Sequence, residues 1–179
     1  MVQPVTTLAQ STRWAVLDFE TTSLDDPHPV EVGLVRGDGV VLLDTLVRPA
    51  VPVGEGARAV HGISDAELAT APAWPEVRAQ LVEALRGIDL LVAYRIDFER
   101  RVLRTVAAHY GLACPAAAVA WYDAHHPPEG REHWSQDSAR ASLGLVEPVP
   151  HRAVGDCHAT LELMQARGDR MRVDVLMGA

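Results

Sequence analysis

The segment at residues 14–20, Trp-Ala-Val-Leu-Asp-Phe-Glu, constrains the fold more than any other part of the chain. Its apolar residues fall on both faces of an extended strand, which is typical of a strand buried inside a sheet. Asp18 and Glu20 interrupt this pattern, and because side chains alternate along a strand, both point to the same side. The sequence therefore predicts a buried strand that places two carboxylates next to each other.

Two carboxylates in such a strand need a partner. At a separation of about 6 Å they repel each other by about 3 kcal/mol at an effective dielectric constant of about 20, and burial adds a desolvation cost. A shared proton or a bound divalent cation would remove this repulsion. An exposed edge strand with scattered acids is the alternative, which the apolar residues on both faces disfavour.

The rest of the chain alternates strand-like and helix-like segments. Residues 30–49 predict two strands around Gly37-Asp38-Gly39, because Asp-Gly between apolar runs is a strong hairpin signal. Ser64 and Glu67 have capping-box spacing at the start of a short helix. We further expect helices at 74–87, 97–111, 135–145 and 155–167 and strands at 89–94 and 118–123. This order predicts an α/β domain whose mixed central sheet, an antiparallel meander plus parallel strands, is flanked by helices.

Composition limits the class of protein. The chain has 179 residues, 48% of them hydrophobic, so we expect a flexible lead-in at 1–12 and a single domain at 13–179. The net charge of −8 argues against coating nucleic acid by bulk charge, but not against handling phosphates through bound cations. There is no membrane-length apolar run and no secretory signal, so we expect a cytoplasmic protein without a membrane partner.

Two further segments carry candidate ligands. His151 lies in a loop, and Asp156 lies in the first turn of the last predicted helix, where the helix dipole alone favours an acid. Asp97 and Glu99 lie where a strand gives way to a helix, at the strand end where open α/β sheets bind ligands. Taken one at a time, a surface histidine and helix N-terminal acids are sufficient explanations.

Together these segments resemble the three exonuclease motifs of the DEDDh 3′–5′ exonuclease family, which includes the epsilon proofreading subunit of bacterial DNA polymerase III. Residues 17–25, Leu-Asp-Phe-Glu-Thr-Thr-Ser-Leu-Asp, are similar to the first motif, and residues 151–156, His-Arg-Ala-Val-Gly-Asp, to the third. Residues 60–74 and 138–145 resemble segments that accompany the motifs. The resemblance spans residues 14–166 and implies a ribonuclease H-like exonuclease fold.

The middle motif departs from the family pattern of Asn-Ala-x-Phe-Asp. Aligned on Phe98, this chain has Arg95 in place of Asn, Ile96 in place of Ala, and Glu99 in place of the metal-binding Asp. Glu99 keeps the charge but adds a methylene group. Asp97 is the other candidate, but it should face away from Glu99 on a helix. We therefore take Glu99 as the ligand.

The resemblance implies a metal-dependent hydrolase that removes nucleotides from the 3′ end of DNA or RNA. It implies two Mg²⁺ or Mn²⁺ ions, which suit an all-carboxylate site. Asp18 would bridge the two ions, Glu20 and Asp156 would hold one of them, and Glu99 would support the other. His151 would be the general base that takes a proton from the attacking water.

The resemblance also implies residues that contact substrate. Thr21, Thr22 and Leu24 follow the first motif, where family members touch the terminal nucleotide, although turn and packing roles explain them equally well. His61 lies in a segment that approaches substrate in the family, with a role at a helix entry as the alternative.

The basic side chains near the middle motif are more ambiguous. Arg100, Arg101 and Arg104 could meet phosphates, but a solvated helix face is the simpler interpretation. Arg95 either pairs with a site carboxylate or competes with a cation for it.

Other functions remain to be distinguished. Arg95 and Glu99 favour a weakened or inactive exonuclease-fold module that binds nucleic-acid ends or a protein partner. A small-molecule phosphoesterase with similar metal chemistry is a third possibility. The implied partners are a single-stranded 3′ end and a polymerase or repair complex. The sequence does not separate DNA from RNA, or proofreading from free-standing DNA repair or processing, and it leaves the oligomeric state open.

Overall fold

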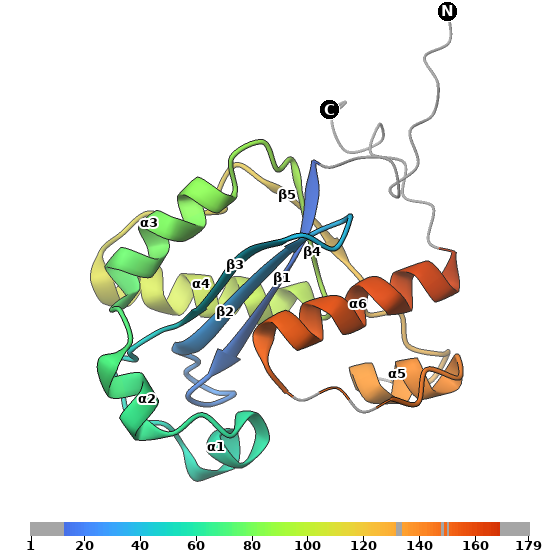
Figure 1. Cartoon of the computed structure of the whole chain (residues 1–179), viewed down its shortest axis with the longest axis horizontal. Helices are drawn as coiled ribbons and strands as arrows, with labels where there is room; N and C mark the ends of the chain where they lie inside the picture. Colours follow the sequence, from blue (N-terminus) through green and yellow to red (C-terminus); the bar gives the residue numbers. More distant parts are fainter. Residues whose placement is uncertain (1–12, 132–133, 148, 150, 169–179) are drawn as a thin grey trace, which may run out of the picture.

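The computed structural model describes residues 13–131, 134–147, 149 and 151–168. Five strands form one sheet in the order β3-β2-β1-β4-β5, with helices on both faces (Figure 1). The strands are β1 (Trp14–Thr21), β2 (Pro29–Arg36), β3 (Val41–Leu46), β4 (Leu90–Ala93) and β5 (Ala120–Asp123). The helices are α1 (Glu55–His61), α2 (Asp65–Thr70), α3 (Trp74–Ala84), α4 (Ile96–Tyr110), α5 (Gln136–Ser142) and α6 (Ala153–Arg167).

Strands β1, β2 and β3 form the predicted antiparallel meander. In the turn between β2 and β3, the Gly39 amide donates to the Arg36 carbonyl at 2.7 Å, and Gly39 has a φ of 89°. Glycine adopts this left-handed conformation without the strain that a Cβ would cause. The Asp38 carboxylate pairs with the Arg36 guanidinium across the same turn. The hairpin predicted from Gly37-Asp38-Gly39 is therefore confirmed.

Strands β4 and β5 extend the sheet in parallel, which makes it mixed, as expected. β1 pairs with β4 only from Trp14 to Val16, although β1 continues to Thr21. Beyond Val16, no strand among the described residues pairs with this side of β1. This opening lies at the carboxyl ends of two parallel strands, where α/β sheets bind ligands.

The two faces of β1 contact different helices. Leu17 and Phe19 pack against the apolar sides of α3 and α4, whereas Val16 packs against α6. Because side chains alternate, Asp18 and Glu20 lie on the α6 face. The residues of α6 that the sequence predicted to face inward are all buried, namely Cys157, Leu161 and Met164.

The predicted helices are present, with boundaries that differ by a few residues. The Ser64–Glu67 capping box is formed, since each residue's backbone amide donates to the other's side chain. Gly111 ends α4 in the left-handed conformation, as predicted. Helix α6 begins at Ala153 rather than at residue 155. Helix α1 was not predicted, because its N-cap, Gly54, provides no side-chain cap that would mark a helix start.

Several expectations concern the termini and the environment of the chain. The lead-in at 1–12 and the end of the predicted domain at 169–179 lie outside the described residues, so the domain boundaries stay predictions. In the described part of the chain, no helix is long and apolar enough to cross a membrane. Cys114 and Cys157 are both free thiols.

Candidate active site

The two acids of β1 face residues of β2 that determine what can lie on this side of the sheet. Asp18 is opposite Gly33, and Glu20 is opposite Glu31. A Cβ on Gly33 would lie 2.6 Å from the carbonyl carbon of Ala153, so a larger residue would push the first turn of α6 away. Gly33 therefore allows the N-terminus of α6 to approach the β1 carboxylates directly.

Glu31 fastens the start of α6 to the same strand. Its side chain is 2% exposed, and its carboxylate accepts hydrogen bonds from Arg152 Nε at 2.9 and 3.0 Å and from the Ala153 amide at 2.9 Å. Arg152 Nη2 also contacts this carboxylate. Because Arg152 directly follows His151, the contact fixes the backbone of the loop that enters α6.

Asp156 lies in the first turn of α6, as predicted. One oxygen each from Asp18, Glu20 and Asp156 lies within 4.8 Å of the other two. His151 Nδ1 is 3.7 Å from Asp156 Oδ2, and its side chain is 47% exposed. The first and third motifs, from opposite ends of the chain, therefore meet at one point.

Glu99 reaches the same acids from α4, through the opening between β1 and β4. It is 2% exposed, and its carboxylate accepts a hydrogen bond from the Phe19 amide, beyond the point where β1 pairs with β4. Its Oε2 is buried and has no hydrogen-bond partner among the described residues. Asp97, in contrast, is exposed to solvent. Both residues line the same cavity, but Glu99 is the one that interacts electrostatically with Asp18 and Glu20.

The acids perturb one another's pKa values. Burial, followed by the charges of Glu99 and Asp156, raises the pKa of Asp18 well above its ordinary value. Burial and the Asp156 charge raise the pKa of Glu20 to about 8. Burial raises the pKa of Asp156 to about 6, although His151 opposes the shift. Burial and the Glu20 charge raise the pKa of Glu99. Without a cation, these groups therefore tend to hold protons.

The donor set suits a divalent cation. All four acids offer carboxylate oxygens, which Mg²⁺ and Mn²⁺ prefer over the sulfur and nitrogen ligands typical of zinc. The unpartnered Oε2 of Glu99 is a buried oxygen that lacks the donor it needs. A cation at this point would supply that partner and offset the repulsion among Asp18, Glu20 and Asp156.

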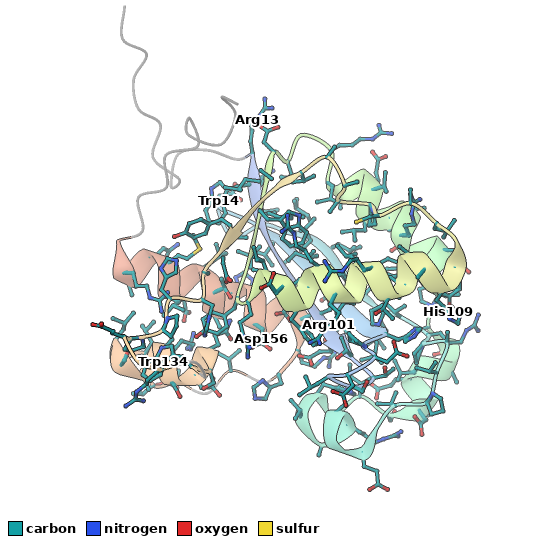
Figure 2. All side chains as sticks on the ribbon, turned by 180° about the vertical axis from the view of Figure 1, so that it is seen from behind. Arg13, Trp14, Arg101, His109, Trp134 and Asp156 are labelled. Carbon is teal, nitrogen blue, oxygen red and sulfur yellow. The ribbon has the colours of Figure 1, made fainter. Side chains whose placement is uncertain are left out.

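A cavity of about 880 Å³ opens beside the acids and is lined by all four, together with His151. Figure 2 labels Asp156 on α6 and Arg101 on α4, two residues that line this cavity from different helices. Arg95 also lines it and has a φ of 73°, the only positive φ of a non-glycine residue in the described part of the chain. Among the described residues, Arg95 forms no ion pair with a site carboxylate.

The residues expected to touch substrate after the first motif differ in their surroundings. The Thr21 hydroxyl donates to the Ser23 carbonyl at 3.0 Å, and the Thr22 hydroxyl accepts from the His28 amide at 3.2 Å. Both threonine side chains are buried, so these contacts shape the turn after β1. Leu24 is 73% exposed and lines the cavity. Of the three, Leu24 has the side chain that is freely available to a ligand.

His61 lies apart from the cavity. It is the last residue of α1 and is 5% exposed, and its Nδ1 accepts a hydrogen bond from the Ile63 amide at 3.0 Å. Burial lowers the pKa of His61. The contact shapes the connection from α1 into α2, which matches the helix-entry alternative more directly than substrate contact.

Three residues that support the site were not identified from the sequence. Glu31 anchors the start of α6. It could have been found by the signal that identified Asp18, an acid within an apolar strand, since it lies between two valines. Asp123 Oδ1 accepts from the amides of Arg95 and His125, each at 2.9 Å, and so holds the start of α4. The side-chain amide of Gln136 donates to the backbone carbonyl of Asp156 at 3.0 Å, a contact that no local sequence pattern predicts.

Known proteins are similar to most of this chain. The family model named RNase_T, described as Exonuclease, matches residues 15–164. The chain is 31% identical over 166 residues to the uncharacterized exonuclease CP81 of Escherichia phage 186. The alignment covers 84% of this chain and 85% of that protein. It is 33% identical over 161 residues to a DNA polymerase III subunit epsilon-like protein of Rhodobacter capsulatus, covering 83% of this chain and 23% of that longer protein.

A solved structure shows the same fold. The nuclease domain of 3′hExo, described as a DEDDh family member bound to rAMP, has a TM-score of 0.71 at 16% identity and covers 88% of this chain and 96% of that one. The mixed sheet flanked by helices is thus the expected ribonuclease H-like fold. The family match also confirms the expectation of a nuclease-class enzyme. Since the RNase_T model covers residues 15–164, this chain belongs to the exonuclease family that includes the epsilon-like proteins.

Proposed function

We propose that this chain is a metal-dependent 3′–5′ exonuclease that hydrolyses the terminal phosphodiester bond of a nucleic-acid strand. The observation that carries the proposal is the convergence of Asp18, Glu20, Glu99 and Asp156 beside one cavity. Burial and the charges of neighbouring acids raise the pKa of all four, and bound cations would offset the repulsion that otherwise favours protonation. Membership of the exonuclease family supports phosphodiester hydrolysis as the chemistry.

In this proposal Asp18, Glu20, Glu99 and Asp156 would hold two Mg²⁺ or Mn²⁺ ions. When bound, such ions offset the negative charge that develops on the phosphate oxygens during hydrolysis. His151 acts as the general base that takes a proton from the attacking water. Two observations support this role for His151. It lines the cavity, and its Nδ1 lies 3.7 Å from Asp156 Oδ2, a contact that would orient the imidazole.

A second candidate is an exonuclease-fold module that binds nucleic-acid ends without efficient cleavage. Arg95 and Glu99, which depart from the family motif, favour it. Against it stands the position of Glu99, whose carboxylate reaches the Phe19 amide and the other acids despite its additional methylene group. A decayed site has no physical need to keep a buried carboxylate oxygen without a hydrogen-bond donor.

The proposed substrate is a single-stranded 3′ end. The epsilon-like relative favours DNA, and the rAMP-bound neighbour favours RNA. A role as a proofreader beside a polymerase, or as a free-standing enzyme in DNA repair, belongs to the same proposal, as does a cytoplasmic location. Co-purification with polymerase subunits and cell fractionation test these points.

The direct test is digestion of 5′-labelled single-stranded DNA and RNA, each with Mg²⁺, with Mn²⁺ and with a chelator. We expect a ladder of products that shorten one nucleotide at a time from the 3′ end, and no products with the chelator. Binding of the labelled strand without shortening in either metal would favour the second candidate instead.

A further inference from the structure

One side of the cavity is lined by arginines that the proposed hydrolysis does not use. Arg95 precedes α4, and Arg101 and Arg104 lie on its exposed face, and all three line the cavity that contains the carboxylates. Residues three apart are neighbours on a helix surface, so Arg101 and Arg104 lie beside each other. In Figure 2, Arg101 is labelled on α4 and Asp156 on α6, two residues of opposite charge that line this cavity.

These arginines form no ion pair in the described part of the chain. Six other arginines form ion pairs with carboxylates: Arg13, Arg36, Arg58, Arg86, Arg140 and Arg152. None of the ion pairs among the described residues involves Arg95, Arg101 or Arg104, although Asp97 lines the same cavity. Because these guanidinium groups form no ion pair beside a cavity that also contains the carboxylates, their donors are available to an anionic ligand.

The contact that holds Arg101 leaves its charge available. Its guanidinium lies 5.3 Å from the centre of the Phe98 ring, a cation–π contact that orients the group without neutralising it. The preceding residue, Arg100, makes the same kind of contact with Trp121 at 5.5 Å but does not line the cavity. Two adjacent arginines therefore have similar environments and differ in whether they face the acids.

We propose that Arg95, Arg101 and Arg104 form a phosphate-binding track that holds the backbone of a single-stranded polynucleotide beside the carboxylate site. The inference rests on the proposed function, because it concerns the same cavity. A polynucleotide fits better than a mononucleotide, since the arginines are spread along α4 while a single scissile phosphate occupies the carboxylate end. Contacts to phosphate oxygens do not depend on the base sequence, so the track should bind strands of any base composition.

The first test measures binding, which does not depend on cleavage. The affinity for fluorescein-labelled decathymidylate is followed by anisotropy over a range of salt concentrations. Ca²⁺ replaces Mg²⁺, and a gel confirms that the strand stays intact. For single strands, the slope of log K against log salt changes by about 0.7 for each phosphate contact. We expect R101A to reduce the slope by about 0.7 and R101A/R104A by about 1.4, whereas R100A keeps the wild-type slope. Equal slopes for R101A and R100A would overturn the track.

The second test separates the track from the hydrolytic site. The p-nitrophenyl ester of thymidine 5′-phosphate can reach the carboxylates but is too short to extend along α4. R101A/R104A should lose about tenfold or more in kcat/KM on decathymidylate at low salt and keep the wild-type kcat/KM on the ester. Equal losses on both substrates would contradict the track.

The two proposals can fail separately. A wild-type protein that binds decathymidylate with an arginine-dependent slope but cleaves nothing would refute the proposed function and support the track. Cleavage of decathymidylate, with salt slopes that are unaffected in R101A/R104A, would support the function and refute the track. Thermal melting of each variant confirms that these exposed substitutions leave the fold intact.

Discussion

Helices α6 and α4 each bring one carboxylate to the acids of β1, but the two helices are held differently. On the α6 side, Glu31 binds both the Arg152 guanidinium and the Ala153 amide, and Gly33 permits direct contact with the strand. Asp156 is therefore placed by contacts that are complete within the protein. This side of the site is preorganised without any ligand.

The α4 side is less complete. Its helix begins after Arg95, which adopts a left-handed conformation that costs a non-glycine residue about 1–2 kcal/mol, and no side chain caps the helix N-terminus. Glu99 is held by the Phe19 amide, but one of its oxygens lacks a partner. The difference is that contacts within the protein hold the start of α6, whereas Glu99 on α4 has one oxygen without a partner, which the proposed cation would supply.

The largest effect is expected for Asp18, the acid that both sides share. Asp18→Asn removes its charge with little change in shape, and we expect kcat to fall by roughly a thousandfold, which corresponds to about 4 kcal/mol of transition-state stabilisation. Single-turnover digestion of labelled DNA measures it. Asp25→Asn is the matched control, because Asp25 is an exposed acid that does not line the cavity. Equal activity of the two variants would remove Asp18 from the mechanism.

The next largest effect tests the preorganised side. Glu31→Gln weakens the anchor of the loop that carries His151, so we expect kcat to fall by roughly 10–100-fold, as for other residues that orient ligands. Glu162→Gln is the control, since it breaks another arginine–carboxylate pair, with Arg140, further along α6. Both variants should lose thermal stability, but Glu162→Gln should keep its activity. Similar activity losses in the two variants would show that activity falls through general destabilisation of the fold and not through loss of the Glu31 anchor.

A smaller effect should come from the α4 side. Glu99→Asp restores the family residue but withdraws the carboxylate from the Phe19 amide by about one bond. We expect kcat to fall by roughly tenfold, about 1.4 kcal/mol, because the backbone here is adapted to glutamate. Asp97→Asn, on the same turn, should change kcat by less than about threefold. An increase in kcat for Glu99→Asp would indicate that this middle motif has weakened the enzyme.

The smallest effect concerns stability and pH. The pKa of Glu20 is raised to about 8 in the folded chain, above its ordinary value of 4.5. Between these pH values the folded state holds more protons than the unfolded state, so the metal-free protein should lose stability as pH rises. We expect a loss of about 1 kcal/mol, roughly 2–4 °C, because solvent still reaches Glu20.

Mg²⁺ should offset that loss, so its stabilising effect should be larger near pH 8 than near pH 5. Melting curves with Mg²⁺ and with chelator at each pH measure the difference. Glu20→Gln is the control, because it removes one of the acids whose pKa is raised and should make the pH dependence of the metal-free protein less steep. A stabilisation by Mg²⁺ that is equal at both pH values would contradict the proposed coupling.

Much of the fold was predictable because its signals are local. The Asp-Gly turn, the Ser64–Glu67 capping box and the C-terminal Gly111 each specify structure within a few residues. The alternation around Asp18 correctly indicated a buried strand with acids on one side. Helix α1 escaped prediction because Gly54 and the residues after it form neither a side-chain cap nor an apolar stripe that marks a helix.

The site residues that belong to a sequence motif were predictable. The residues that position them through contacts between distant parts of the chain were not. Alignment on Phe98 selected Glu99, which the structure places among the acids. The role of Glu31 depends on Arg152, 121 positions later, and no local pattern specifies that pairing. For Thr21 and Thr22 the motif leaves substrate contact and a turn role equally open, and their hydroxyls hydrogen-bond within the turn.

The most direct test of the account is crystallography with manganese, because its central claim is that acids from three segments share divalent cations. Crystals soaked in Mn²⁺ should show anomalous density at bonding distance from Asp18, Glu20 and Asp156, and the unpartnered oxygen of Glu99 should turn toward it, directly or through water. Absence of density at these carboxylates, or a separation of Glu20 from Asp156 that no ion could bridge, would contradict the account.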